Sequence, residues 1–160
     1  MRNLLVSLFI MTVSNCVLAN DAGELKVGGH KLGGIRADIA ATSVGVETKT
    51  RTDGTEVLKI RGGEAAQSTI WLVKSRIVMI EGKTATIDGN VLHVWQSESL
   101  VRHILGSPLE SRSFPDSGCL PAHKQLRYIR KTQILKVGLR KKIGRWVVDH
   151  ITLQQAKPKV

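Results

Sequence analysis

The chain has 160 residues, and its 24 Lys and Arg residues outnumber its 13 Asp and Glu residues, which gives a formal net charge of +11. This length fits one domain better than several. Only two cysteines are present, so a disulfide-rich scaffold is excluded and the fold must depend on an apolar core. The basic balance favours an anionic partner.

The first 19 residues have the organisation of a cleavable secretory signal peptide. A short basic start precedes an apolar run from Leu4 to Val13, and the segment ends in Val17-Leu18-Ala19. The apolar run is about half the roughly 20 residues that a membrane-spanning helix needs, and we expect no transmembrane segment. We therefore expect cleavage after Ala19, a single domain at residues 20–160, and a location in the bacterial periplasm or the secreted fraction.

A lipoprotein signal is the minority alternative for the same segment. Val13-Ser14-Asn15-Cys16 has the outline of such a signal, and it would anchor the protein through a lipid on Cys16. Asn15 departs from the small residue that normally precedes the lipidated cysteine. After cleavage at Ala19 the domain keeps one cysteine, Cys119, which is then buried, free or paired with another chain.

The amino-terminal part of the domain favours two strands. Residues 23–34 are glycine-rich and predict a loop or a frayed strand. A run rich in β-branched residues follows from Ile35 to Thr52, and an Asp53-Gly54 turn separates it from a second strand at Val57–Arg61.

Short β-branched runs separated by turn residues continue through the centre and predict an antiparallel meander. The expected strands are Thr69–Val73, Arg76–Ile80, Thr84–Ile87 and Val91–Trp95, with turns at Glu81-Gly82-Lys83 and Asp88-Gly89-Asn90. One helix is expected after Ser97, because apolar residues then recur at helical spacing until Gly106 and Pro108.

The carboxy-terminal third predicts a long connection and then three strands. Residues 107–121 contain three prolines and are expected to hold little regular structure. The strands are expected at Leu126–Lys131, Ile134–Leu139 and Arg145–Leu153, with a turn at Arg140–Gly144. The expected fold class is mainly β, as a small antiparallel meander, sandwich or barrel with one short helix.

Positive charge is concentrated in this last third, and that concentration is the main functional signal. Between residues 124 and 145 no Asp or Glu occurs, and in Ile134–Arg140 the charges alternate with apolar residues, which places them on the face opposite the core. We expect these basic residues to bind the partner, with Arg140, Lys141 and Lys142 at a hairpin tip. The candidate residues are Lys124, Arg127, Arg130, Lys131, Lys136, Arg140, Lys141, Lys142 and Arg145.

The sequence offers weak candidates for catalysis. Ser117-Gly118-Cys119, preceded by His103, resembles the active-site stretch of L,D-transpeptidases, which implies a cysteine enzyme acting on the cell wall. That family has a residue between the serine and the glycine, and here Ser117 abuts Gly118. Asp149 and His150 are neighbours in a predicted strand and are expected to face opposite sides, which makes them a poor acid/base pair.

No cofactor, metal or nucleic acid is expected. Pro121 separates Cys119 from His123, and the other histidines are too scattered to complete a tetrahedral metal site. The paired glycines at 28–29 and 33–34 lack the residues of a phosphate-binding loop. Export argues against nucleic acid, and Tyr128 is the only aromatic residue among the basic ones.

The expected function is therefore a non-enzymatic binding or adaptor protein of the bacterial cell envelope. Its basic hairpin would hold an acidic protein surface or an anionic envelope polymer. A periplasmic inhibitor or immunity protein is the alternative, and the cell-wall cysteine enzyme is the less favoured one. The partner's identity and the oligomeric state are left open.

Overall fold

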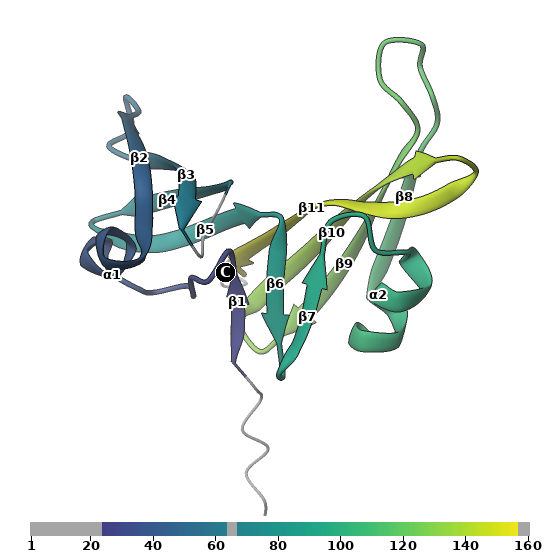
Figure 1. Cartoon of the computed structure of the whole chain (residues 1–160), viewed down its shortest axis with the longest axis horizontal. Helices are drawn as coiled ribbons and strands as arrows, with labels where there is room; N and C mark the ends of the chain where they lie inside the picture. Colours follow the sequence, from purple (N-terminus) through teal and green to yellow (C-terminus); the bar gives the residue numbers. More distant parts are fainter. Residues whose placement is uncertain (1–23, 64–66, 157–160) are drawn as a thin grey trace, which may run out of the picture.

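A computed structural model describes residues 24–63 and 67–156 of the chain (Figure 1). The expected signal peptide, with Cys16, lies outside the described residues. Strands make up 59% of the structure and helices 12%, and the sheets are antiparallel. The mainly β class is confirmed, with two helices in place of the expected one and no closed barrel among the described strands.

The larger sheet consists of two four-stranded meanders joined side by side. Its strand order is β2-β3-β4-β5-β11-β10-β9-β8, so the last strand of the chain returns to lie beside β5. The bounds are β2 Ser43–Thr50, β3 Glu56–Gly63, β4 Ser68–Val73, β5 Arg76–Gly82, β8 Glu110–Phe114, β9 His123–Arg130, β10 Gln133–Lys142 and β11 Arg145–Gln155.

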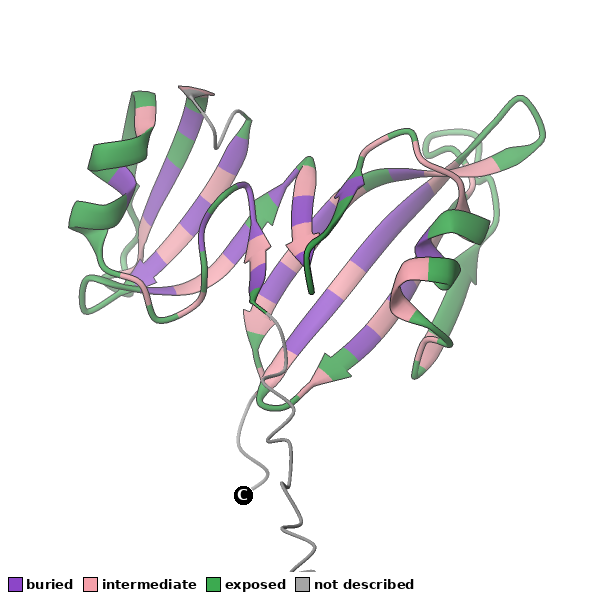
Figure 2. Ribbon diagram, turned by 60° about the horizontal axis from the view of Figure 1, so that its bottom comes forward, coloured by how far each residue is buried: buried purple, intermediate pink, exposed green. Residues whose placement is uncertain are grey.

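A small sheet and one helix cover the inner face of the larger sheet. The small sheet has the order β1-β6-β7, with β1 Leu25–Val27, β6 Thr84–Ile87 and β7 Asn90–His93, and α2 spans Glu98–Leu105. Figure 1 shows both elements in front of β9, β10 and β11. A single hydrophobic cluster lies between them and includes Val27, Ile87, Leu92, Val101, Leu126, Leu135, Val137, Ile151 and Leu153. Figure 2 shows buried positions interspersed with less buried ones along the strands.

Several turn and cap predictions are confirmed. The Asp53 side chain accepts a hydrogen bond from the Thr55 N–H at 2.9 Å, and Gly54 has φ of 78°. Asp88 and Gly89 both have positive φ and form the tight turn between β6 and β7. Ser97 caps α2 by accepting a hydrogen bond from the Leu100 N–H.

The predicted β run from Ile35 to Thr52 is wrong in its first half, where α1 spans Arg36–Thr42. The Asp38 carboxylate accepts a hydrogen bond from the Ile35 N–H at 3.0 Å, and the Ile39 side chain is buried in the core. Three alanines in this segment also favour helix. The β-branched residues that suggested a strand belong mainly to β2.

Two predictions about irregular segments are also wrong. The expected turn around Gly82 is absent, because β5 runs through Gly82 and only Lys83 separates it from β6. A Cβ at position 82 would lie 3.1 Å from Val27 Cγ1, so the glycine allows β1 to approach closely. The long connection at residues 107–121 contains β8, and its prolines lie outside that strand.

The expected turn at Arg140–Gly144 is shorter than predicted. β10 continues to Lys142 and pairs with Arg145, so the turn consists of Ile143 and Gly144 alone, with φ of 48° and 76°. Arg140, Lys141 and Lys142 therefore lie in a strand and not in a loop. Strand alternation places Arg140 and Lys142 on the outer face of the sheet and Lys141 on the other face.

Candidate anion-binding hairpin

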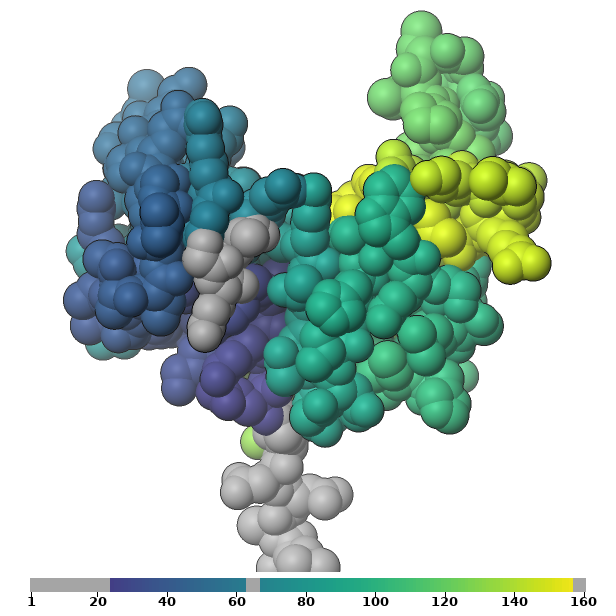
Figure 3. All heavy atoms as spheres, viewed as in Figure 1, coloured from purple at the N-terminus to yellow at the C-terminus, as the bar shows by residue number. Residues whose placement is uncertain are grey.

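The end of the β10–β11 hairpin gathers exposed cations around an exposed isoleucine. We call this segment, residues 141–145, the hairpin tip. Lys141, Lys142 and Arg145 are exposed, and Ile143 is 93% exposed. Figure 3 shows this part of the chain projecting from the body of the molecule, below the loop that joins β8 to β9.

Trp95 lies beside the tip, although it is far from it in the sequence. Its backbone N–H donates a hydrogen bond to the Val148 carbonyl at 2.8 Å, and the Val148 backbone N–H donates to the Gln96 carbonyl at 2.8 Å. These bonds extend the sheet beyond the end of β5 and place the indole on the outer face. The sequence marked Trp95 only as the end of a strand, and no local signal predicts this contact.

Two cations pack on the same indole ring. The Arg140 Cζ atom is 4.1 Å from the ring centroid of Trp95, and the Lys142 Nζ atom is 4.2 Å from it. Such cation–π contacts hold long side chains in place without cancelling their charge. A hollow of about 510 Å³ opens next to them and is lined by Trp95, Lys142, Ile143, Arg145 and Val147.

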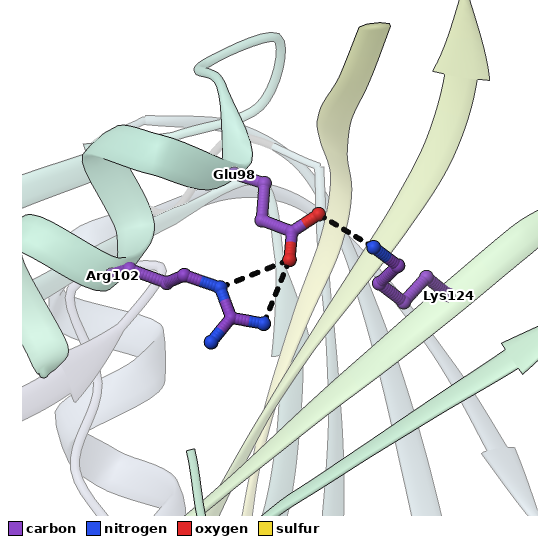
Figure 4. Close-up of polar contacts among 3 residues, drawn as sticks. All are labelled: Glu98, Arg102 and Lys124. Carbon is purple, nitrogen blue, oxygen red and sulfur yellow. Dashed lines mark hydrogen bonds and ion pairs between the residues drawn. The ribbon is translucent and has the colours of Figure 1, made fainter. Parts of the chain in front are cut away.

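Lys124, one of the predicted partner-binding residues, already has a carboxylate partner within the fold. Its Nζ lies 2.7 Å from Glu98 Oε2, and Arg102 binds the other carboxylate oxygen of Glu98 at 2.9 and 3.0 Å (Figure 4). The Lys124 side chain is 16% exposed and also packs on Trp146. Burial alone would raise the pKa of Glu98, but the hydrogen bonds from Lys124 and Arg102 outweigh it and lower that pKa.

The remaining predicted residues do not form one patch. Arg127 is paired with Glu110 at 3.5 Å, and Arg130 is paired with Asp88. Lys131 lies in the turn between β9 and β10, at the opposite end of the hairpin from the tip. Lys136 is half-buried in the middle of β10. Among the described residues, Lys124, Arg127 and Arg130 therefore have carboxylate partners, whereas Lys131, Lys136 and the cations of the tip have none.

Asp149 and His150 contact each other, so the expectation that they face opposite sides is wrong. Gly138 pairs with His150 and Leu139 pairs with Val148, which leaves Asp149 as the extra residue of a β-bulge. The bulge breaks the strict alternation and lets the Asp149 Oδ2 atom lie 3.3 Å from His150 Nδ1. The other carboxylate oxygen of Asp149 is 3.2 Å from Arg140 Nε.

Asp149 and His150 belong to no complete catalytic set among the described residues. A carboxylate beside an imidazole can fix the ring for proton transfer, but a nucleophile would also be needed. Within residues 24–63 and 67–156, no hydroxyl or thiol is hydrogen-bonded to His150. Asp149 forms an ion pair with Arg140, whose guanidinium group also packs on Trp95.

A second hollow of about 380 Å³ lies next to Arg140 on the same face. It is lined by residues from β8, β9, β10, β11 and the β8–β9 loop, and it includes His123 and Phe114, whose rings stack at 4.5 Å. Cys119 is exposed in that loop. The described part of the chain holds no group of three His, Cys, Asp or Glu residues that fits a metal ion.

Among the described residues, no helix is long and apolar enough to cross a bilayer. No protein-family model, no curated protein and no solved structure matches the chain.

Proposed function

We propose that the chain is a non-enzymatic binding protein of the bacterial cell envelope, which holds an anionic partner with its hairpin tip. The observation that carries this proposal is the unpaired charge of Lys141, Lys142 and Arg145. No carboxylate of the described residues lies within ion-pair distance of any of them. The envelope location is supported by the signal-peptide pattern of the first 19 residues.

The contrast with the basic residues of the neighbouring strand β9 strengthens the argument. Farther from the tip, Lys124, Arg127 and Arg130 each have a carboxylate partner from another element. At the tip, like charges crowd together with no such partner and repel one another. Exposed clusters of this kind raise the association rate of an oppositely charged partner.

Trp95 restrains Lys142, one of the three cations of the tip, together with the neighbouring Arg140. The two cations pack on the indole ring of Trp95, and Arg140 also forms an ion pair with Asp149. Side chains that are already ordered lose less conformational entropy when they bind a partner. The arrangement therefore favours capture of an anionic surface over simple solvation.

Binding to poly-L-glutamate, as a soluble acidic probe, tests the proposal. Replacing Lys141, Lys142 and Arg145 by Ser should slow association on the order of tenfold and remove most of its salt dependence. The matched control replaces three exposed cations of β2, β3 and their connection, Lys49, Arg51 and Lys59, by Ser. It removes the same charge and should bind nearly as the wild type does.

Thermal unfolding of both triple variants accompanies the binding assay. Each should stay within about 0.5 kcal/mol per substitution of the wild type, because the changed side chains are exposed. If the tip variant and the control variant lose binding equally, the tip has no special role and the proposal fails.

A further inference from the structure

The residue at the apex of the hairpin, Ile143, is β-branched and apolar, which is unusual for a solvent-exposed turn. Ile143 has the most exposed of the large apolar side chains among the described residues. Its φ of 48° lies in the left-handed region, which β-branched residues rarely adopt. Two-residue hairpin turns of this geometry favour Asn or Gly at that position. An isoleucine here brings backbone strain and an unburied side chain, and neither helps the fold.

Cations surround this apolar apex on both strands. Lys142 precedes Ile143 and pairs with Arg145 across the hairpin, while Lys141 lies on the opposite face of β10. Trp95 is 50% exposed at the edge of the same hollow. The tip therefore combines an exposed aliphatic side chain with three cations, and an indole ring lies beside it.

A second loop projects beside the tip and also presents an apolar residue. The connection between β8 and β9 extends from the same end of the larger sheet as the hairpin (Figures 1 and 2). Leu120 in that connection is 62% exposed. Two neighbouring projections that each carry an exposed aliphatic side chain suit a broad surface better than a narrow pocket.

We propose, on the basis of the function proposed above, that the anionic partner is a bilayer surface that contains anionic phospholipids. Ile143 enters the boundary between headgroups and acyl chains, and Lys141, Lys142 and Arg145 contact lipid phosphates. Trp95 lies at the level of the headgroups, where indole rings are favoured because one side is apolar and the other is hydrated. Binding is peripheral and uses basic and apolar side chains together.

An acidic protein fits these observations less well. A stable protein interface buries about 800 Å² on each partner, and charged residues are depleted at its centre. The tip is a narrow convex projection with cations around one isoleucine. A soluble anionic polymer would use the cations but would leave Ile143 exposed. A bilayer has no fixed shape to match and accepts both kinds of side chain.

Co-sedimentation with lipid vesicles tests the inference. The protein is produced from the full chain in bacteria and purified in whatever processed form results. It is then mixed with vesicles of phosphatidylcholine alone, or of phosphatidylcholine and phosphatidylglycerol in equal parts. We expect binding to the anionic vesicles to exceed binding to the neutral ones. The Lys141, Lys142 and Arg145 triple Ser variant should lose on the order of a hundredfold in affinity.

The decisive variant is Ile143→Ser, which keeps every charge. It should weaken binding to anionic vesicles on the order of tenfold, because an isoleucine side chain no longer leaves water. Val44→Ser, which changes an exposed apolar residue of β2, is the matched control and should bind as the wild type does. Anionic vesicles should also shift tryptophan emission to the blue, and Trp95→Phe should remove that shift.

The outcomes separate this inference from the proposed function. Equal binding of Ile143→Ser and wild type to anionic vesicles overturns the inference, as does equal binding of the wild type to neutral and anionic vesicles. Binding to poly-L-glutamate without binding to vesicles also overturns it and leaves the proposed function standing. Binding to neither probe contradicts both.

Discussion

The imidazole ring of His150 lies directly over Gly138, the residue opposite it on β10. A Cβ at position 138 would be 2.2 Å from His150 Cε1 and 2.5 Å from His150 Nε2. The bulge at Asp149 comes immediately before this pair in β11 and places the ring there. Gly138 is therefore required by a side chain from another strand and not by its own backbone conformation.

Gly138→Ala should lower the free energy of unfolding by about 1 kcal/mol, because the ring must leave the strand and give up its contact with Asp149. Urea unfolding measures the change. In a His150→Ser background the same substitution should be close to neutral. An equal loss in both backgrounds would mean that the backbone at position 138, and not the ring, excludes a side chain.

Glu98→Gln should lower the free energy of unfolding by about 1–2 kcal/mol, because Lys124 keeps its partly buried charge and loses its carboxylate. The folded-state pKa of Glu98 is lowered, so its contribution is present above the ordinary pKa of about 4.3 and disappears as the pH falls through the folded-state value. Chemical unfolding at neutral and acidic pH measures both effects.

Glu24→Gln is the control for this prediction. Glu24 and Lys26 form an ion pair at 2.9 Å, but both side chains are largely exposed. The loss of this ion pair should change the free energy of unfolding by less than about 0.5 kcal/mol. A loss as large as that of Glu98→Gln would show that burial does not distinguish the two ion pairs.

Stability should fall as the pH drops below about 6.5, the ordinary pKa of histidine, because of His30. This side chain is 6% exposed, and its Nε2 has no hydrogen-bond partner among the described residues. Burial lowers the pKa of His30, against an opposing effect of Asp38. The unfolded chain therefore binds the proton more readily than the folded one.

His30→Leu removes this titration and should flatten the dependence of unfolding free energy on pH between about 5 and 6.5. The slope due to His30 is at most about 1.4 kcal/mol per pH unit. Denaturant melts across this range measure it. A variant that keeps the full slope of the wild type would assign the pH dependence to other groups.

We predict that the chain is exported and that its mature form begins at Asn20 and carries no lipid, because Val17-Leu18-Ala19 precedes that position and Asn15 precedes Cys16. Intact-mass measurement of the protein from the cell envelope tests the prediction. A diacylated species that begins at Cys16 would contradict it and would place the protein on a membrane through its lipid.

Local sequence determined the features that depend on residues a few positions apart. Asp53-Gly54 and Asp88-Gly89 predicted their turns because these residues accept positive φ, and Ser97 predicted the start of α2 because its hydroxyl can bind a free N–H. The alternation in Ile134–Arg140 predicted the faces of β10, because side chains of a strand alternate by geometry. Even here, α1 was missed, since a seven-residue helix depends on the burial of Ile39 against distant strands.

Only the tertiary structure decided which cations are free. Lys124 and Lys142 look alike in the sequence, but the fold brings Glu98 to the first and Trp95 to the second. The bulge at Asp149 likewise depends on the register between β10 and β11, which no single strand specifies. A cation is neutralised by a carboxylate that lies close to it in space. The distance between the two groups depends on strand order and register across the whole sheet. The distribution of Lys and Arg along the sequence revealed that the last third is basic. The packing of distant strands determined that the cations of the hairpin tip have no carboxylate partner among the described residues.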